Sequence, residues 1–492
     1  GGERMKVIGD SLPRRFKAKA SGSITAGKPC IVEADGDVAQ VALVSVPQAV
    51  GSYVEPETNV AEEIDGTFDS TNNKVVFVYD DETADVPDAI VGTISGTSIS
   101  FGSPTSFDTG ASYLRVTFNS SSGKVVAAYR DGDNSGYGTS VVGTVSGTGI
   151  SFGTPVVFKS ADSRHIEIGS ADGANVVIVY RGSSGYGHGI VGAISGTSIS
   201  FGSATSISNS NNKFEFSAVS YDSNADAVLI SYVGDSSYGY SAVGTISGTS
   251  ISFGTPAQFN STNQLNTSDR SVSSDFDSTT NQIAIGFIDN SDSGKCKAVM
   301  ATISGTSVSF GSVATVDSND CGYPSVQYHA AGERVVVAFR KQTGTDELQA
   351  AAGTVSGTGV SFATAFTVDS ADSGGTVYSY VSLVYDSNLT SLAVGYKSYG
   401  SNNRRFRSNV FQIAHNAPNL TSENYIGIAE YAAADTETAT VLIKGGVSTT
   451  QSSLTPGQTY FVQTDGTIGT SAGTPSVTAG TAVTSTKLIV KG

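Results

Sequence analysis

Short hydrophobic segments recur along most of the chain, and turns rich in Gly, Ser, Asn and Asp separate them. The phrase VGTISGTSISFG at residues 91–102 is nearly restated in five later places. Its turn glycines are Gly96, Gly147, Gly196, Gly248, Gly305 and Gly357. A hydrophobic run that ends in an aromatic residue recurs in step with it, at Tyr79, Tyr129, Tyr180, Tyr232, Phe287, Phe339 and Tyr396. Self-similarity with a period of about 50 residues is typical of repeat architectures.

Each repeat predicts four short strands. In the fourth repeat they are Phe216–Tyr221, Ala227–Tyr232, Ser241–Ile246 and Thr249–Phe253, with a tight Ser247-Gly248 hairpin between the last two. The second strand is almost wholly hydrophobic in several repeats, which indicates a strand covered on both faces. Four antiparallel strands repeated in this way predict an all-β fold, a β-propeller whose small sheets stack side by side.

The seventh repeat lacks its outermost strand. It has segments at 380–385, 392–396 and 409–413, whereas the segment at 41–47 near the N-terminus resembles residues 99–104 of the first repeat. We therefore expect residues 39–413 to form a seven-bladed β-propeller, closed by an N-terminal outer strand at 39–48 paired with 409–413, which removes exposed sheet edges. An open solenoid is the alternative, but it leaves the missing strand unexplained.

The flanking residues 1–38 and 414–492 carry a duplication. The segment 23–36 (SITAGKPCIVEADG) matches 453–466 (SLTPGQTYFVQTDG), each with strands around a glycine turn and an Asp-Gly turn. We expect both termini to build one small β domain. The direction of the strands predicts that the chain enters and leaves the propeller at the face of the uniform Ser-Gly turns, with the terminal domain beneath it.

The opposite face of the propeller carries loops that differ from repeat to repeat, which suggests that recognition takes place there. Tyrosines stand in these loops at Tyr137, Tyr186, Tyr238, Tyr240 and Tyr399. A tyrosine ring offers a flat apolar face and a polar end, so these five are the candidate ligand-binding residues for a sugar or a polar protein surface. The alternative is that they pack on neighbouring loops.

Composition limits the possible partners. The net charge is 28 − 44 = −16, charged residues make up 15% of the chain, and hydrophobic residues 38%. A chain this acidic repels phosphate backbones, so nucleic acid is not an expected partner. No run of 18 apolar residues is present, so membrane insertion is not expected either. The first residues, Gly1–Met5, carry no secretory signal pattern, although earlier processing of the N-terminus stays open.

Enzyme signatures are weak, and no catalytic residue is predicted. The four histidines fall in separate repeats, and no nucleophile elbow or phosphate-binding loop is found. Trp is absent, which excludes the Trp-bearing motifs of other propellers.

Two loops resemble calcium loops, and no other cofactor is expected. Asp131, Asp133 and Ser135, and again Asp289, Ser291 and Ser293, give alternating oxygen ligands before a glycine. The twelfth-position carboxylate is missing in both, where Val142 and Met300 stand, so polar hairpin loops are the alternative.

The chain has three cysteines, too few for a disulfide scaffold. Cys296 and Cys321 fall in adjacent repeats near the varied face, where a disulfide is conceivable. Three buried thiols including Cys30 are the alternative.

The last stretch carries the segments YIGIAE (425–430), LTPGQTYFV (454–462) and LIVKG (488–492). These segments and the Ser-Gly-Thr repeats resemble tail-fibre and other virion structural proteins of marine tailed bacteriophages. The resemblance implies a virion surface, extracellular protein, joined to other virion proteins through the terminal domain. We expect a non-enzymatic protein whose propeller binds a host-surface glycan or protein. A glycan-cleaving propeller enzyme and a passive capsid decoration protein are the alternatives.

Overall fold

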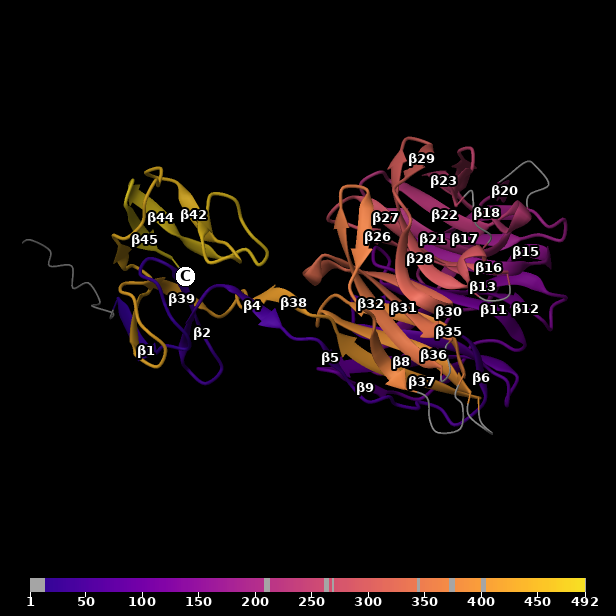
Figure 1. The fold of residues 1–492 in the computed structure, drawn as a ribbon, viewed down its shortest axis with the longest axis horizontal. Coiled ribbons are helices and arrows are strands. Elements are labelled where there is room, and N and C mark those ends of the chain that lie inside the picture. Colours follow the sequence, from indigo (N-terminus) through magenta and orange to yellow (C-terminus); the bar gives the residue numbers. More distant parts are fainter. Residues whose placement is uncertain are drawn as a thin grey trace, which may run out of the picture. The chain divides into compact units, whose positions relative to one another are not determined.

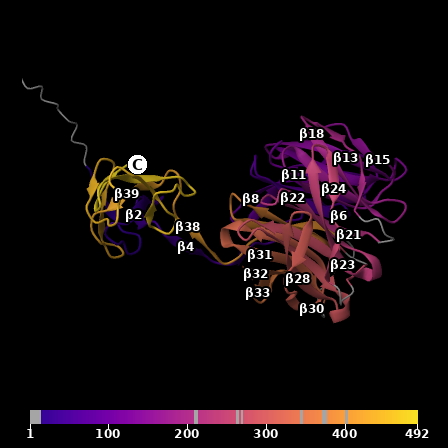
Figure 2. The ribbon, with the colours of Figure 1, turned by 90° about the horizontal axis from the view of Figure 1, so that it is seen from above.

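The computed structural model describes residues 14–207, 213–260, 265–267, 270–342, 346–370, 377–399 and 404–491. They form two compact units, one running from Pro47 to Ile413 and one that combines the chain up to Val46 with the chain from Ala414 onward (Figure 1, Figure 2). Strands make up nearly all regular structure of this part of the chain. The short 3₁₀ helices are η1 (Asp235–Ser237), η2 (Asn290–Asp292) and η3 (Ala330–Gly332).

The larger unit is built from antiparallel sheets that repeat the same order of strands. The innermost strands are β6 (Ala61–Asp69), β11 (Ala111–Asn119), β16 (Arg164–Ser170), β21 (Glu215–Asp222), β26 (Val272–Asp277), β30 (Ala314–His329) and β35 (Val377–Asp386). The second strands are β7 (Lys74–Asp81), β12 (Lys124–Asp131), β17 (Asn175–Arg181), β22 (Ala227–Val233), β27 (Gln282–Asp289), β31 (Arg334–Lys341) and β36 (Ser391–Tyr399). The third strands are β8 (Val86–Ser95), β13 (Tyr137–Ser146), β18 (Gly187–Ser195), β23 (Gly239–Ser247), β28 (Lys295–Ser304), β32 (Glu347–Ser356) and β37 (Arg404–Gln412).

The outer edge of a blade consists of two short strands, both of which pair with the third strand. The first of the two are β9 (Ser98–Phe101), β14 (Gly149–Phe152), β19 (Ser198–Phe201), β24 (Ser250–Phe253), β29 (Ser307–Phe310) and β33 (Gly359–Phe362). The second are β10 (Thr105–Ser106), β15 (Val156–Asp162), β20 (Thr205–Ser206), β25 (Ala257–Asn260) and β34 (Phe366–Ser370). In the fifth blade the first part of β30 takes this place and then continues as the innermost strand of the sixth, so one nine-stranded sheet contains both blades.

The blades stand side by side in a circle. Each innermost strand lies against the innermost strand of the next blade, and β35 of the last blade lies against β6 of the first. The second strands are buried on both faces, as the continuous hydrophobic runs predicted; Val75–Tyr79 is one example. Separate hydrophobic clusters fill the spaces between neighbouring blades. This repeated four-stranded arrangement is that of propeller blades.

The repeated phrase holds adjacent blades together at their outer edges. A Cβ atom built on Gly102 would lie 1.9 Å from the carbonyl oxygen of Thr148 in the next blade's hairpin turn. No side chain fits so close an approach, which explains why the Phe-Gly and Ser-Gly-Thr elements recur together. The same approach, at 1.7–2.0 Å, joins Gly153 to Thr197, Gly202 to Thr249, Gly254 to Thr306 and Gly311 to Thr358.

The N-terminal outer strand expected at residues 39–48 is not found there. Within that range, β3 (Val38–Gln40) pairs in the terminal unit, and β4 (Leu43–Val46) pairs with β38 (His415–Pro418). The segment that pairs with β37 is β5 (Ala49–Val50), and the chain joins the propeller after Val46 rather than after residue 38.

The residues after β5 repeat the contacts of the other blades. A Cβ on Gly51 would lie 1.8 Å from the carbonyl oxygen of Thr97, and the Gly51 amide donates to Val410 O at 2.9 Å. Gly102 donates to Val91 O at the same distance. Val50-Gly51 therefore stands beside β37 as Phe101-Gly102 stands beside β8.

The smaller unit has two five-stranded sheets. One sheet holds β1 (Arg15–Lys19), β40 (Thr438–Leu442), β39 (Tyr425–Ala429), β2 (Pro29–Val32) and β3. The other holds β41 (Val447–Ser448), β45 (Lys487–Val490), β44 (Thr478–Thr484), β42 (Thr459–Val462) and β43 (Ile468–Gly469). The duplicated segments form equivalent hairpins, β2–β3 and β42–β43, and residues of both sheets share one hydrophobic core.

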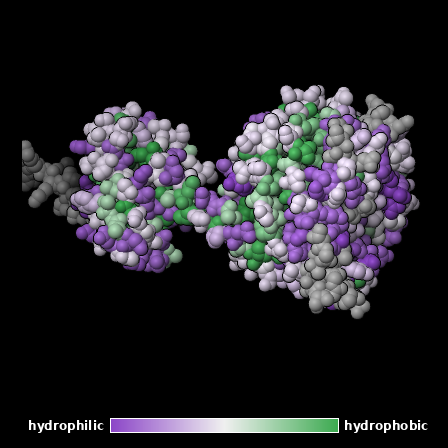
Figure 3. Space-filling view, viewed as in Figure 1, coloured by the Kyte–Doolittle hydropathy of each residue, from purple (hydrophilic) through white to green (hydrophobic). Residues whose placement is uncertain are grey.

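No helix in the described ranges is long and apolar enough to cross a membrane. On the face drawn in Figure 3, hydrophobic and hydrophilic side chains are interspersed over each unit.

Candidate functional site

The innermost strands carry a backbone irregularity at the same place in almost every blade. In six blades the pairing with the second strand skips two residues near the start of the innermost strand, which is a β-bulge. The first bulged residue has a positive φ of 43–53° although none of the six is glycine; these residues are Glu63, Tyr113, His165, Phe216, Tyr323 and Tyr380. A left-handed conformation is costly for residues with large side chains, and such strain concentrates at functional sites.

The innermost strands surround the axis of the propeller, and the bulges place the six side chains around one end of this central channel, the channel mouth. We call these six residues the collar. All six are half-buried and line one cavity of about 120 Å³ together with Arg115 and Arg270. His165 lies 5.2 Å from the Tyr113 ring and 5.0 Å from the Phe216 ring, between centroids. Tyr323 and Tyr380 contact each other at 5.7 Å. Burial, then the cationic side chains of Arg181, Arg115 and others, lowers the pKa of His165 to about 3, so its ring is neutral at physiological pH.

The mouth lies at the end of the propeller where the innermost strands begin. Since strands alternate in direction, the third strand of the last blade, β37, ends at the opposite end, where the Ser-Gly turns stand. The collar is therefore on the face of the variable loops, which is the face predicted for recognition.

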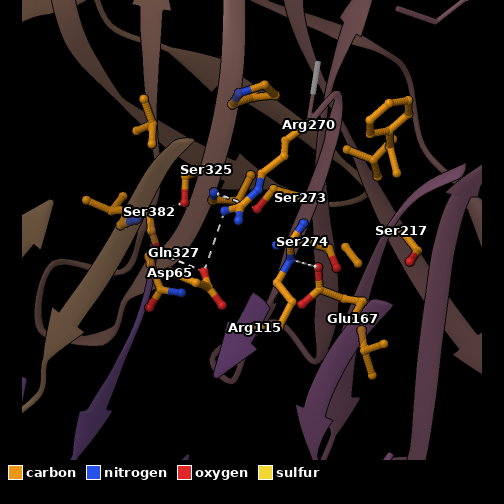
Figure 4. A pocket seen from close by; sticks show the side chains of 18 of the residues that line it. Asp65, Arg115, Glu167, Ser217, Arg270, Ser273, Ser274, Ser325, Gln327 and Ser382 are labelled. Carbon is orange, nitrogen blue, oxygen red and sulfur yellow. Dashed lines mark hydrogen bonds and ion pairs between the residues drawn. The ribbon is translucent and has the colours of Figure 1, made fainter. Parts of the chain in front are cut away.

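Beneath the collar lies a second cavity, the axial cavity, of about 150 Å³ with a polar wall (Figure 4). Its charged residues are Asp65, Arg115, Glu167 and Arg270. Its uncharged polar residues are Ser217, Ser273, Ser274, Ser325, Gln327 and Ser382. Arg115, Phe216, Ser217 and Arg270 line both cavities, so they form the boundary between the two.

Ion pairs connect these charges across blades. Arg115 Nε contacts Glu167 Oε2 at 2.9 Å, and Arg115 Nη1 contacts Glu63 Oε2 at 3.5 Å. Arg270 stands farther from its carboxylates, 3.7 Å from Glu63 and 3.9 Å from Asp65. The Asp65 carboxylate accepts hydrogen bonds from Ser382 Oγ and from the Val116 amide, each at 3.0 Å. The wall of the cavity is thus a network of fixed charges contributed by several blades.

The carboxyl group of Glu167 is the site's candidate acid. Burial raises its pKa, and the neighbouring Arg115 opposes that shift.

The predicted tyrosines do not lie in this cavity. Tyr399 is 44% exposed and lies under the Arg404 guanidinium at 5.4 Å. The other four are half-buried. Tyr240 stacks on Tyr232 with centroids 5.8 Å apart and accepts a hydrogen bond from Gln258 at 2.7 Å. This placement does not test the expected role of the five tyrosines, so ligand binding by them stays a prediction.

The candidate calcium loops use their carboxylates within their own turns. Asp131 Oδ1 accepts from the Asn134 amide at 2.9 Å. Asp289 Oδ1 accepts from the Ser291 amide and hydroxyl and caps η2. Asp133, Ser135 and Ser293 belong to the same two turns; Ser135 and Ser293 take positive φ angles. Within the described part of the chain no three His, Cys, Asp or Glu side chains gather as metal ligands. The calcium site gains no support from this geometry.

The cysteines are free thiols, and all three are buried. Cys296 of the fifth blade and Cys321 at the start of the sixth belong to one hydrophobic cluster. The neighbouring Cys296 thiol adds to the effect of burial in raising the pKa of Cys321. The two thiols lie near each other, as expected, but the possible disulfide is not formed in this structure.

The sequence contained a signal for the collar that the repeat pattern alone did not reveal. Tyr113, Tyr323 and Tyr380 each precede the first turn residue of their blade, at Asn119, His329 and Asp386, by six positions. In a regular strand, a residue at that position would point to one of the two faces of its sheet. The bulge, which re-aims the side chain toward the channel, cannot be seen without coordinates.

Comparisons with known proteins bear on the fold. The structure is similar to the BP39L lectin from Burkholderia pseudomallei, with a TM-score of 0.53 and 10% identity, over 71% of this chain and 98% of the lectin. The chain shares a propeller fold with a lectin. A weaker likeness, with a TM-score of 0.43 and 10% identity, is to the NanB sialidase from Streptococcus pneumoniae, over 73% of this chain and 69% of the sialidase. No family model and no curated protein matches the sequence.

Proposed function

We propose that the protein is a carbohydrate-binding propeller whose binding site is the collar and the polar cavity beneath it. The observation that carries the proposal is the strained collar, in which five of six side chains are aromatic, next to a cavity lined by guanidinium, carboxylate and hydroxyl groups. Aromatic faces pack against the apolar faces of sugar rings, and fixed charged groups hydrogen-bond sugar hydroxyls in both directions. The propeller fold shared with a lectin supports the same function.

The proposal places binding in the channel mouth rather than on the loop tyrosines. Titration calorimetry with oligosaccharides chosen from a glycan array should show binding that Phe216→Ala and Tyr380→Ala reduce at least about tenfold, since each removes an aromatic contact. Tyr399→Ala and Tyr137→Ala should leave it unchanged. Loss of binding with the loop variants but not with the collar variants would move the site to the loops.

We propose further that binding takes place without cleavage. Arg115 holds Glu167 and Asp65 accepts two hydrogen bonds, so both carboxylates serve in the fixed network. A glycan-cleaving enzyme is the second candidate, favoured by the raised pKa of Glu167, because a general acid must hold its proton near neutral pH. Release of reducing ends from a bound glycan, lost in Glu167→Gln, would establish the enzyme.

The resemblance of the C-terminal segments to virion proteins supports a place on a tailed-phage appendage. In that setting the smaller unit would attach to other virion proteins and the propeller would bind the host surface. Labelling of the protein in purified particles with an antibody against the terminal unit tests this part of the proposal. Absence of the label from particles that contain all other structural proteins would contradict it.

A further inference from the structure

One blade departs from the others at the second bulged residue. This position is buried in the six bulged blades, and five of them place an apolar residue there: Ile64, Leu114, Ile166, Pro324 and Val381. The fourth blade has Ser217, whose hydroxyl has no hydrogen-bond partner among the described residues. A buried, unpaired hydroxyl destabilises a fold at a position where an apolar side chain would fit. Ser217 lines both cavities.

The second departure is Arg270, in the blade that lacks the bulge. Its Nη1 donates to the carbonyl oxygen of Ile64 at 2.8 Å. Among the residues that the structure describes, Nε and Nη2 have no hydrogen-bond acceptor, and Glu63 Oε2 lies 3.7 Å from Nη2. These two nitrogens form one edge of the guanidinium group, and their N–H bonds point in parallel. That edge matches the two oxygens of a carboxylate.

The two arginines of the cavity differ in how well their charge is compensated. Burial lowers the pKa of Arg115, but the carboxylates of Glu167, Glu63 and Asp65 raise it by more. Burial and the nearby Arg115 lower the pKa of Arg270, and Asp65, Glu63 and Glu167 do not offset this. The charge of Arg270 is therefore less well compensated than that of Arg115, since its carboxylate partners stand at 3.7 and 3.9 Å whereas Glu167 stands 2.9 Å from Arg115.

We propose that the axial cavity binds a sugar acid, with the ligand's carboxylate on the Nε–Nη2 edge of Arg270 and a ligand hydroxyl on Ser217. This inference rests on the proposed function and names its ligand class. The carboxylates of Glu63, in the collar, and of Asp65 and Glu167, in the cavity wall, disfavour a doubly charged group, so a singly charged carboxylate fits better than a phosphate. The small volumes of the two cavities, about 150 and 120 Å³, suit one terminal sugar residue rather than a long chain.

Titration calorimetry on the full chain tests the inference, with D-glucuronate, D-galacturonate and N-acetylneuraminate against glucose, galactose and the methyl ester of glucuronate. One or more of the acids should bind at least about tenfold more tightly than its neutral counterparts. Arg270→Lys should remove that preference, because an ammonium group keeps the charge but not the two-pronged edge. Arg334→Lys is the matched control, since Arg334 hydrogen-bonds backbone carbonyls of Gly332 and Glu333 far from the collar.

Ser217→Ala gives a readout that a purely structural role would not produce. It should weaken binding of the acid while raising the melting temperature, because the unpaired hydroxyl is removed. Equal binding of acidic and neutral sugars would overturn the carboxylate inference and leave the proposed function standing. Inorganic phosphate that binds as tightly as the sugar acids would also overturn it. Absence of binding to any sugar would overturn both.

Discussion

The hydroxyl of Ser382, in the last blade, donates to the carboxylate of Asp65, in the first, at 3.0 Å. The same hydroxyl accepts a hydrogen bond from the Gly66 amide at 2.9 Å. Beside it, Lys397 Nζ contacts both carboxylate oxygens of Glu62 at 2.5 Å. Polar contacts thus join the two blades that are farthest apart in the sequence, next to the wall of the axial cavity.

We expect Ser382→Ala to lower the free energy of unfolding by about 1–3 kcal/mol, because the half-buried Gly66 amide loses its acceptor and the Asp65 carboxylate loses a donor. Chemical denaturation monitored by circular dichroism measures the change. Ser120→Ala, at an exposed turn, should stay within about 0.5 kcal/mol of the parent protein. An unchanged midpoint for Ser382→Ala would mean that this contact does not stabilise the junction.

Gly51 tests whether the N-terminal segment completes the last blade. A Cβ at Gly51 would lie 1.8 Å from Thr97 O, so Gly51→Ala must displace backbone and should cost about 1–3 kcal/mol or more. Gly102→Ala, at the equivalent place in the first blade, should cost a similar amount. Gly149→Ala is the matched control, since its nearest neighbour is 3.8 Å away. A Gly51→Ala protein as stable as the Gly149→Ala protein would show that the segment does not pack there.

The repeats made the blades and four strands of each predictable, because their glycines and hydrophobic runs serve the same contacts each time. The second short strand at the outer edge of a blade was not predicted. The outer strand of the last blade was misplaced because residues 41–47 resemble the outer strand of the first repeat, whereas the segment that packs beside Thr97 is Val50-Gly51. The collar and Arg270 could not be predicted from the sequence, for another reason. A bulge changes the direction of a side chain without any change in composition, and Arg270 stands in the blade that lacks one.

Asp275 gives the propeller a pH dependence. Burial raises its pKa to about 6, while an unfolded chain has an ordinary aspartate value of about 3.9. The folded state therefore holds a proton that the unfolded state has lost between these values, and this contribution to stability falls as the pH rises from about 4 to 6. Asp275→Asn should raise the free energy of unfolding at pH 8 by about 1–2 kcal/mol and have little effect at pH 4.

The Tyr328 amide donates to Asp275 Oδ2 at 2.7 Å, and an asparagine oxygen can accept the same bond. Denaturation midpoints at pH 4 and pH 8 measure the difference. A stabilisation of equal size at both values would show that ionisation of Asp275 is not its cause.

The thiols should be protected in the native protein. Burial raises the pKa of Cys30 to about 12, and burial followed by the adjacent Cys296 thiol raises the pKa of Cys321. Because thiolates are the reactive form, a thiol reagent at pH 8 should modify none of the three cysteines until denaturant is added, and then all three. Rapid modification of Cys296 or Cys321 in the native protein, located by peptide mass mapping, would show that the junction between the fifth and sixth blades opens.

The strain in the collar predicts an unusual ranking of substitutions at Phe216. Its φ of 43° lies in the left-handed region, which glycine adopts freely and alanine adopts at a cost of about 1–2 kcal/mol. Phe216→Gly and Phe216→Ala both lose the ring, so the difference between them reports the backbone. We expect the glycine variant to be the more stable by about 1 kcal/mol in chemical denaturation. At Phe214, which is buried and has no positive φ, alanine should be the more stable by about 0.5–1 kcal/mol. The same ranking at both positions would show that the collar carries no strain, whereas opposite rankings would show that the fold stabilises a costly backbone to hold this aromatic ring at the channel mouth.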